Sequence, residues 1–204
     1  MNVDRRRSTV GGVWIVIAIL LFASGAMSSG CASDGSASSP RLIIDDSVAG
    51  DFKALAVETW DRFLTVFQAR SDCFGDVRLW ATRSLNSRAA YDPDSATVTV
   101  RVPGTPAMLQ SALVHEWAHH IEFQCEAHKD LRLAFLAAQG LPPDTVWRPD
   151  DAPANMPSSQ WADIPSEQYA ETMIEVVLGR RQIPTNARVT REAVRVIEEW
   201  AAGD

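Results

Sequence analysis

Apolar side chains recur with the 3.6-residue spacing of a helix in several stretches of this chain. In the stretch 51–69 they form one stripe, which predicts a partly buried helix with Asp51 as its N-cap. The longest stretch starts with Thr105 as N-cap and Pro106 at the first helical position, and it extends to about Cys125. Shorter helices are expected at about 129–139, 167–178 and 190–201.

Three short runs predict strands, at 41–45, 77–82 and 96–102. The third run alternates strictly, so its valines face one way and its polar side chains face the other, as in a strand with one exposed side. These polar residues are Thr97, Thr99 and Arg101. Residues 86–88 are expected to form a loop, and residues 91–94 a turn.

The long central helix carries an HExxH motif at residues 115–119. Two histidines four residues apart, His115 and His119, project from the same face of a helix, so both imidazoles can bind one metal ion. Glu116 comes from an adjacent line of the helix and can reach a water on that ion. The alternative is two histidines that form hydrogen bonds in an ordinary helix.

Residues 141–166 form a long connection that contains six prolines and two tryptophans. Loops of this length in compact domains are either functional or disordered, and tryptophans that can be buried argue against disorder. We therefore expect a lid over a substrate site. The alternative is a rigid surface covering. Ser166 is expected to cap the helix that follows.

The 204 residues are enough for one domain with a sizeable core. Their net charge of −7 argues against a nucleic-acid partner, because phosphate binding needs a basic face. Three arginines at 5–7 precede an apolar run at 13–23. This run is short for a membrane span and typical of a signal peptide, so residues 1–30 are expected to be a signal peptide and the protein to be exported.

Cys31 follows a series of small residues and begins a Ser/Gly-rich stretch, 31–40, which is expected to be a flexible tether. This arrangement resembles the N-terminus of a bacterial lipoprotein. The resemblance implies that Cys31 carries lipid and anchors the domain 41–204 to a membrane of the cell envelope. Ser28 departs from the usual pattern, so cleavage after Ala26, which gives a secreted soluble protein, and an uncleaved anchor both remain as alternatives.

Two further cysteines, Cys73 and Cys125, favour one disulfide if the compartment is oxidising. The bond would close a loop of 52 residues. The chain-entropy model gives roughly 4 kcal/mol of stabilisation for a loop of that size. Two buried free thiols are the alternative.

A catalytic zinc site needs three protein ligands and an open position for water. His120 points about 100° away from His119 on the helix, and His128 lies too close to the helix end to fold back easily. Carboxylates remain, and Glu167 and Glu171 lie one helical turn apart on one face. The first can bind the metal while the second accepts a hydrogen bond from a metal-bound histidine. A solvated acidic face is the alternative.

HExxH at 115–119 followed by Glu-x-x-Ala-Glu at 167–171 resembles the gluzincin zinc metallopeptidases. The spacing and the form look closer to small bacterial gluzincins and to catalytic domains of the anthrax-lethal-factor type than to thermolysin, in which the gap is shorter, and the resemblance covers about 97–178. It implies an α+β, zincin-like domain with a small β-sheet over the HExxH helix and a second helix that bears the glutamate. It also implies Zn²⁺ as cofactor, with His115, His119 and Glu167 as ligands. Glu171 would accept a hydrogen bond from one of the metal-bound histidines.

The same family places an edge strand above the metal helix, antiparallel to the bound peptide. The run 96–102 matches this strand in position and pattern. Thr97, Thr99 and Arg101 are therefore expected to belong to the substrate-binding strand.

Many relatives in this family also have a tyrosine or histidine that stabilises the oxyanion, on a loop before the glutamate helix. The two tyrosines of this chain, Tyr91 and Tyr169, lie elsewhere. His120, His128 and an arginine remain as candidates for this role.

These features predict an exported zinc endopeptidase that acts on a peptide or protein substrate. The ion would lower the pKa of a water towards ~7. Glu116 would accept the proton of that water and pass it to the leaving amine. Two alternatives remain: an inactive envelope protein that keeps a zinc-binding peptidase fold, and a structural lipoprotein without metal.

Overall fold

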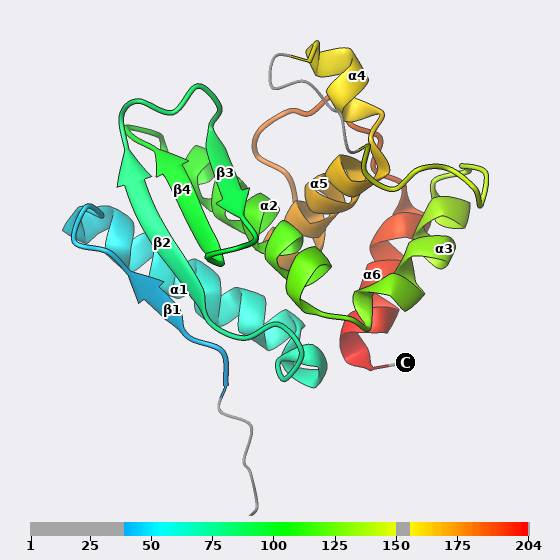
Figure 1. The fold of residues 1–204 in the computed structure, drawn as a ribbon, viewed down its shortest axis with the longest axis horizontal. Coiled ribbons are helices and arrows are strands. Elements are labelled where there is room, and N and C mark those ends of the chain that lie inside the picture. Colours follow the sequence, from blue (N-terminus) through cyan, green and yellow to red (C-terminus); the bar gives the residue numbers. More distant parts are fainter. Residues whose placement is uncertain (1–38, 150–155, 204) are drawn as a thin grey trace, which may run out of the picture. The chain divides into compact units, whose positions relative to one another are not determined.

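The computed structural model describes residues 39–149 and 156–203. The expected signal peptide, Cys31 and most of the expected tether lie outside the described residues. Within the described ranges a single small sheet is combined with helices, which agrees with the predicted α+β class (Figure 1). In chain order the elements are β1 (Leu42–Ile44), α1 (Gly50–Val66), η1 (Gln68–Arg70), β2 (Val77–Thr82), β3 (Ala89–Asp92), β4 (Thr97–Arg101), α2 (Pro106–Gln124), α3 (His128–Ala138), α4 (Ser158–Ala162), α5 (Pro165–Leu178) and α6 (Arg191–Ala202).

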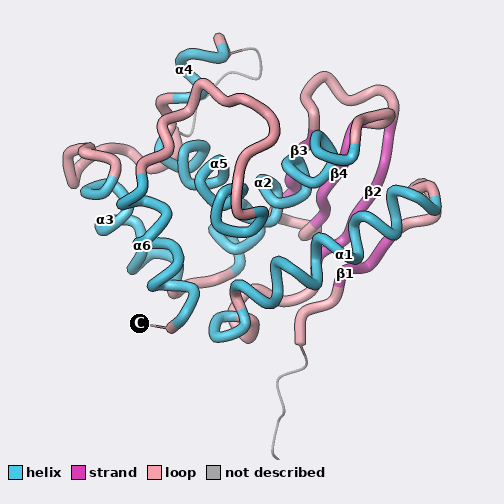
Figure 2. The backbone as a smooth tube through the Cα atoms, turned by 180° about the vertical axis from the view of Figure 1, so that it is seen from behind, coloured by secondary structure: helices cyan, strands magenta, loops and turns pink. Residues whose placement is uncertain are grey.

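The four strands lie in the order β1-β2-β4-β3. β2 pairs in parallel with β1 and with β4, whereas β3 pairs antiparallel with β4. Helices α1 and α2 cover one face of this sheet, as the two opposite views show (Figures 1 and 2). The free edge on the β4 side is therefore β3, a strand that the sequence pattern did not predict. The expected turn lies two residues later, at 93–96.

The prediction that β4 is the substrate-binding edge strand is wrong. Its backbone pairs with β2 on one side and with β3 on the other, so it has no free edge for an added peptide. Val98 and Val100 are fully buried in the core, as the alternation predicted. Thr97, Thr99 and Arg101 therefore lie on the opposite face of the sheet, away from the helices.

Helix α1 covers the sheet with a stripe of buried aromatic side chains, but its start differs from the prediction. The N-cap is Ala49, and Asp51 lies within the first turn. The Asp51 carboxylate accepts a hydrogen bond from the N–H of its neighbour Phe52 at 2.8 Å, so it does not cap the helix. The helix ends at Val66, and the short 3-10 helix η1 follows it.

Helix α2 is the centre of the domain and contacts α1, α5, β3 and β4. Thr105 caps it as predicted, because its hydroxyl accepts a hydrogen bond from the Met108 N–H at 3.3 Å. Trp117 anchors the helix in the core, with its ring centroid 4.9 Å from that of Trp60. This packing fixes the rotation of α2 and so the direction of its histidines.

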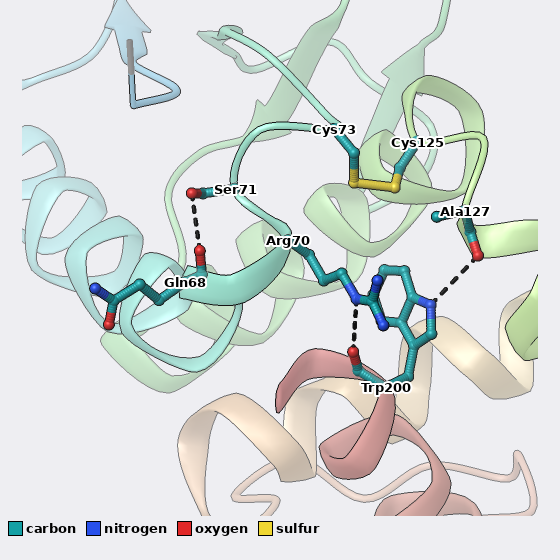
Figure 3. The surroundings of a disulfide bond; sticks show 7 residues. All are labelled: Gln68, Arg70, Ser71, Cys73, Cys125, Ala127 and Trp200. Atoms are coloured by element: carbon teal, nitrogen blue, oxygen red, sulfur yellow. Dashed lines mark hydrogen bonds between the residues drawn. A yellow bond between two sulfur atoms is a disulfide. The ribbon is translucent and has the colours of Figure 1, made fainter. Parts of the chain in front are cut away.

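The C-terminal end of α2 is tied to the segment that follows α1. Cys125, the C-cap of α2, forms the predicted disulfide with Cys73 (Figure 3). Beside it, the Arg70 Nε donates a hydrogen bond to the Trp200 carbonyl at 2.8 Å, and the Trp200 indole donates to the Ala127 carbonyl at 3.3 Å. The ends of α1 and α2 are therefore joined to α6.

Helix α5 packs along α2 and starts earlier than expected. Its N-cap is Ile164 and Pro165 is the first helical residue, so the prediction of Ser166 as N-cap is wrong. Ser166 lies inside the first turn, where its N–H donates to the Trp147 carbonyl at 3.1 Å. Gly179, with φ of +76°, is the C-cap, so the helix ends at Leu178, as the expected range 167–178 predicted. None of the helices in the described ranges combines the length and hydropathy that a membrane span requires.

Candidate metal centre

Two helices bring together three side chains that could hold a metal ion. His115 and His119 project from α2, and Glu167 projects from the first turn of α5. The two Nε2 atoms lie 3.2 Å apart. Glu167 Oε2 lies 3.1 Å from the Nε2 of His115 and 3.4 Å from that of His119. These residues form a potential metal-binding triad, in the combination that the motif predicted.

A carboxylate stands behind each histidine. Glu171 Oε1 lies 3.0 Å from the Nδ1 of His115, as predicted for this residue. Glu122 Oε2 lies 2.9 Å from the Nδ1 of His119, a contact that the sequence reasoning missed. The spacing of Glu122 could have identified it, because a residue three positions after His119 lies on the same helix face. Both imidazoles can therefore donate through Nδ1 and keep Nε2 for a metal.

Glu122 is buried and accepts hydrogen bonds on both oxygens. The Trp147 indole donates to its Oε1 at 2.9 Å, and the Arg148 guanidinium reaches both oxygens, at 3.2 and 2.9 Å. Burial alone would raise the pKa of Glu122, but the hydrogen bonds from His119 and Arg148 outweigh it and lower the pKa to about 2. Glu122 is therefore a fixed negative charge at neutral pH.

Hydrogen bonds within and beside the triad shift the pKa values of its members. Burial would lower the pKa of His115, but hydrogen bonds to Glu167 and Glu171 raise that pKa to about 10. Burial would raise the pKa of Glu167, yet the two histidines hold it far below its usual range. The same carboxylates that retain a proton on His115 can retain a metal cation between the three side chains.

Glu116 has the environment expected of a base. Its side chain lines the cleft beside the triad, and the residue is only 7% exposed. Burial raises the pKa of its carboxyl group, while the neighbouring His115 and His119 oppose that rise. A carboxylate with a raised pKa can accept a proton near neutral pH more readily than an ordinary glutamate.

The triad lies in a cleft of about 550 Å³. One wall is the free edge of the sheet around β3, and another is the segment after α5, which the sequence reasoning treated only as a break. Trp161 of α4 covers the centre, because its ring stacks on His115 at a centroid distance of 5.7 Å. Lining residues from these three parts include Ser87, Arg88, Tyr91, Ser158, Trp161, Arg181, Ile183, Pro184 and Thr185.

Neither candidate histidine for an oxyanion contact is among the described residues that line this cleft. His120 is fully buried, and its Nε2 lies 3.3 Å from the Gly75 carbonyl. Because a carbonyl only accepts, His120 donates through Nε2 and its Nδ1 accepts from the Tyr91 hydroxyl at 2.9 Å. Burial lowers the pKa of His120 to about 4, so it is neutral and serves to orient Tyr91.

His128 is also buried, in a cluster of aromatic rings that includes Trp147 and Tyr169. Burial lowers its pKa to about 3. Tyr169 is fully buried and does not line the cleft in the described part of the chain. Of the candidates from the sequence, the arginine alternative remains, since Arg148 and Arg181 both line the cleft.

Comparisons of this chain with protein-family models, with curated proteins and with solved structures found no match. The resemblance to gluzincins therefore depends on the motif at 115–119 and on the glutamate pair at 167–171. Support for a function comes from the geometry of the triad and of the cleft around it.

Proposed function

We propose that the protein is a zinc-dependent peptidase with a gluzincin-like, zincin-type site. The observation that carries this proposal is the size of the donor triangle, whose sides are 3.1, 3.2 and 3.4 Å. A tetrahedral zinc ion with bonds of about 2.0–2.1 Å separates its ligands by roughly 3.3 Å. Two imidazoles and one carboxylate are also a donor set of catalytic zinc sites, and they leave one position for water.

The carboxylates behind the histidines support the same proposal. Glu171 and Glu122 fix the ring orientation of His115 and His119, respectively, through Nδ1. Both Nε2 lone pairs then point to one place, which is the arrangement that a metal centre needs. A pair of histidines that only stabilised a helix would not require two buried carboxylates in these positions.

A bound zinc ion would lower the pKa of a water towards ~7 and polarise a substrate carbonyl. Glu116, beside the triad, would accept the proton of that water on its carboxylate. The raised pKa of Glu116 allows it to hold this proton until it is delivered to the leaving amine. Trp161 and the walls of the cleft would limit access of bulk water.

The substrate we propose is an extended peptide or protein segment. The free edge of β3 borders the cleft through Ala89 and Tyr91. A peptide strand can add to such an edge by main-chain hydrogen bonds. In this arrangement β3 takes the role that the sequence assigned to β4.

We also propose that the protein is exported to the cell envelope, anchored by lipid on Cys31. The Cys73–Cys125 disulfide in the described domain agrees with an oxidising compartment. Metabolic labelling with a radioactive or clickable fatty acid tests the anchor, with Cys31→Ser as the comparison. Equal labelling of both proteins would contradict the anchor, and release of an unlabelled domain would favour the secreted soluble form.

Peptide cleavage by the full chain tests the proposed activity. Wild type and Glu116→Gln are loaded with zinc, and their products from a peptide library are compared. Because general acid–base catalysis contributes about 10²–10⁴-fold, the variant should bind zinc normally and lose at least about 100-fold in turnover. If zinc is bound but the wild type cleaves no more than the variant, the inactive zinc-binding alternative holds. If purified wild type binds no zinc, the structural alternative without metal holds.

A further inference from the structure

One guanidinium group connects the two helices that supply the triad. Arg148 lies in the segment between α3 and α4. Its Nη1 lies 3.3 Å from Glu167 Oε1, on α5. Its Nε and Nη2 lie 3.2 and 2.9 Å from the two oxygens of Glu122, on α2. Arg148 therefore contacts the third predicted ligand and the carboxylate behind the second ligand at the same time.

The two oxygens of Glu167 have different surroundings. Oε2 faces the Nε2 atoms of His115 and His119, at 3.1 and 3.4 Å. Oε1 faces the Arg148 guanidinium. A carboxylate can bind a metal through one oxygen or through both, and a donor on one oxygen favours binding through the other.

We propose that Arg148 is a positioning residue that restricts Glu167 to metal binding through Oε2 alone and thereby keeps one coordination position for water. The inference rests on the proposed zinc site and adds to it the device that sets its coordination number. If both oxygens of Glu167 bound the ion, Oε1 would compete with the attacking water for that position.

Arg148 is held in place on several sides, as a positioning residue must be. Its guanidinium lies over the Phe123 ring, at 5.3 Å from the centroid. The preceding residue, Trp147, bonds to both helices, because its indole donates to Glu122 and its carbonyl accepts from the Ser166 N–H. The segment therefore presents the arginine with little freedom to move.

The Nη2 of Arg148 also lies 2.8 Å from the Nδ1 of His119. Both atoms carry hydrogen when Nε2 binds a metal, so neither can accept from the other. Glu122 Oε2 lies 2.9 Å from each of them and accepts from both. Glu122 and Arg148 thus work as a pair that fixes the ring of His119.

Arg181 provides the contrast. It pairs with Glu171, the carboxylate behind His115, and it also donates to the Glu171 backbone carbonyl at 2.9 Å. In the described part of the chain, none of its contacts reaches His115, His119 or Glu167. Of these two arginines, Arg148 is therefore the one that contacts a predicted metal ligand directly.

The test compares wild type with Arg148→Lys and Arg148→Gln in the full chain. Lysine keeps a cation but cannot reach both carboxylates with a planar fork. Zinc affinity is measured by chelator competition, and coordination number by the visible spectrum of the Co²⁺-substituted protein. A matched control is Arg195→Gln, which removes an exposed arginine that pairs with Glu199 on α6.

Loss of such a supporting contact costs about 10–100-fold in metal affinity. We expect this loss in Arg148→Gln, together with a Co²⁺ spectrum that shifts from the intense four-coordinate form to the weaker form of higher coordination. Arg148→Lys should show the same spectral shift, and Arg195→Gln should match wild type in both measurements.

Two outcomes overturn the inference, and they are distinguishable. If wild type binds zinc and both Arg148 variants keep its affinity and Co²⁺ spectrum, the positioning role is wrong and the zinc site stands. This includes the case in which the variants only unfold at lower temperature. If wild type binds neither metal, the proposed function fails, and the role of Arg148 fails with it.

Discussion

At the scale of single residues, the proposed metal centre depends on which nitrogen of each histidine already has a hydrogen-bond partner. Glu171 and Glu122 occupy the Nδ1 atoms of His115 and His119. The Nε2 atoms are thereby directed to Glu167 without any cost of reorientation when a metal binds. Affinity for the metal should therefore depend on these two carboxylates almost as strongly as on the ligands.

Glu122→Gln and Glu171→Gln should each weaken zinc binding by about 10–100-fold, because an amide holds the imidazole less firmly and leaves the ring less basic. Chelator competition measures the dissociation constants. Glu126→Gln is a matched control, since Glu126 pairs with Lys129 on the surface. Wild-type affinity in both test variants would show that the carboxylates do not support the metal.

His128 gives the domain a dependence on pH that is separate from the metal. Its pKa is lowered by burial to about 3 in the folded state, against an ordinary value of 6.5. The unfolded chain therefore binds a proton first as the pH falls. The stability associated with the neutral ring is complete above pH 6.5 and is lost progressively below it.

At pH 5 this loss amounts to about 2 kcal/mol relative to pH 7.5. His128→Phe should lack it, so its free energy of unfolding should fall less than that of wild type over the same interval. Urea denaturation of both proteins, with chelator present throughout, measures the difference. Parallel pH profiles for the two proteins would contradict a buried neutral His128.

At the scale of elements, much of the site could be predicted because it depends on local periodicity. The HExxH spacing places His115 and His119 on one helix face, and Glu167, on the helix expected at 167–178, supplies the proposed third ligand. The edge strand could not be predicted in this way. Ala89–Asp92 is short and lacks apolar alternation, and its pairing with β4 decides which strand is the edge.

The contacts of Arg148 and Trp147 could not be predicted either, because both residues lie in a long proline-rich connection without periodicity. Their role follows only from the docking of that connection between α2 and α5. The contact of Glu122 could have been predicted from the sequence, since Glu122 is spaced three residues from His119 on the same helix. Contacts made within one helix can be read from spacing, and contacts made between loops and helices cannot.

The topology of the sheet makes a prediction about substrate contacts. Thr99 is not among the described residues that line the cleft, so Thr99→Ala should leave kcat/KM within about twofold of wild type. Trp161, which stacks on His115, should behave differently. Loss of that aromatic contact in Trp161→Ala, about 1 kcal/mol, should lower kcat/KM by roughly fivefold. The reverse order of effects in peptide cleavage would contradict a substrate site in the cleft beside Trp161.

At the scale of the whole molecule, the described domain combines helices with one sheet, and α2 is in contact with α1, α3, α5, β3 and β4. Aromatic packing sets its rotation, the Cys73–Cys125 disulfide ties its C-terminal end, and α5 brings the third ligand to it. The geometry of the proposed metal site should therefore be lost when the domain as a whole unfolds, rather than in a separate local step.

The disulfide closes a loop of 52 residues. Its removal in Cys73→Ala/Cys125→Ala should lower the free energy of unfolding by about 2–4 kcal/mol, through the greater entropy of the unfolded chain. Denaturant titration of the double variant beside oxidised wild type measures the change. Equal midpoints would show that the crosslink contributes nothing to the fold.

The most direct measurement of the central claim is zinc K-edge X-ray absorption on the full chain with one equivalent of zinc. The account predicts two imidazole nitrogens and one carboxylate oxygen, with a further light atom, at about 2.0–2.1 Å. It also predicts that Glu167→Ala loses the carboxylate contribution. A zinc ion bound by other groups, or a spectrum unchanged in Glu167→Ala, would contradict a site made of His115, His119 and Glu167.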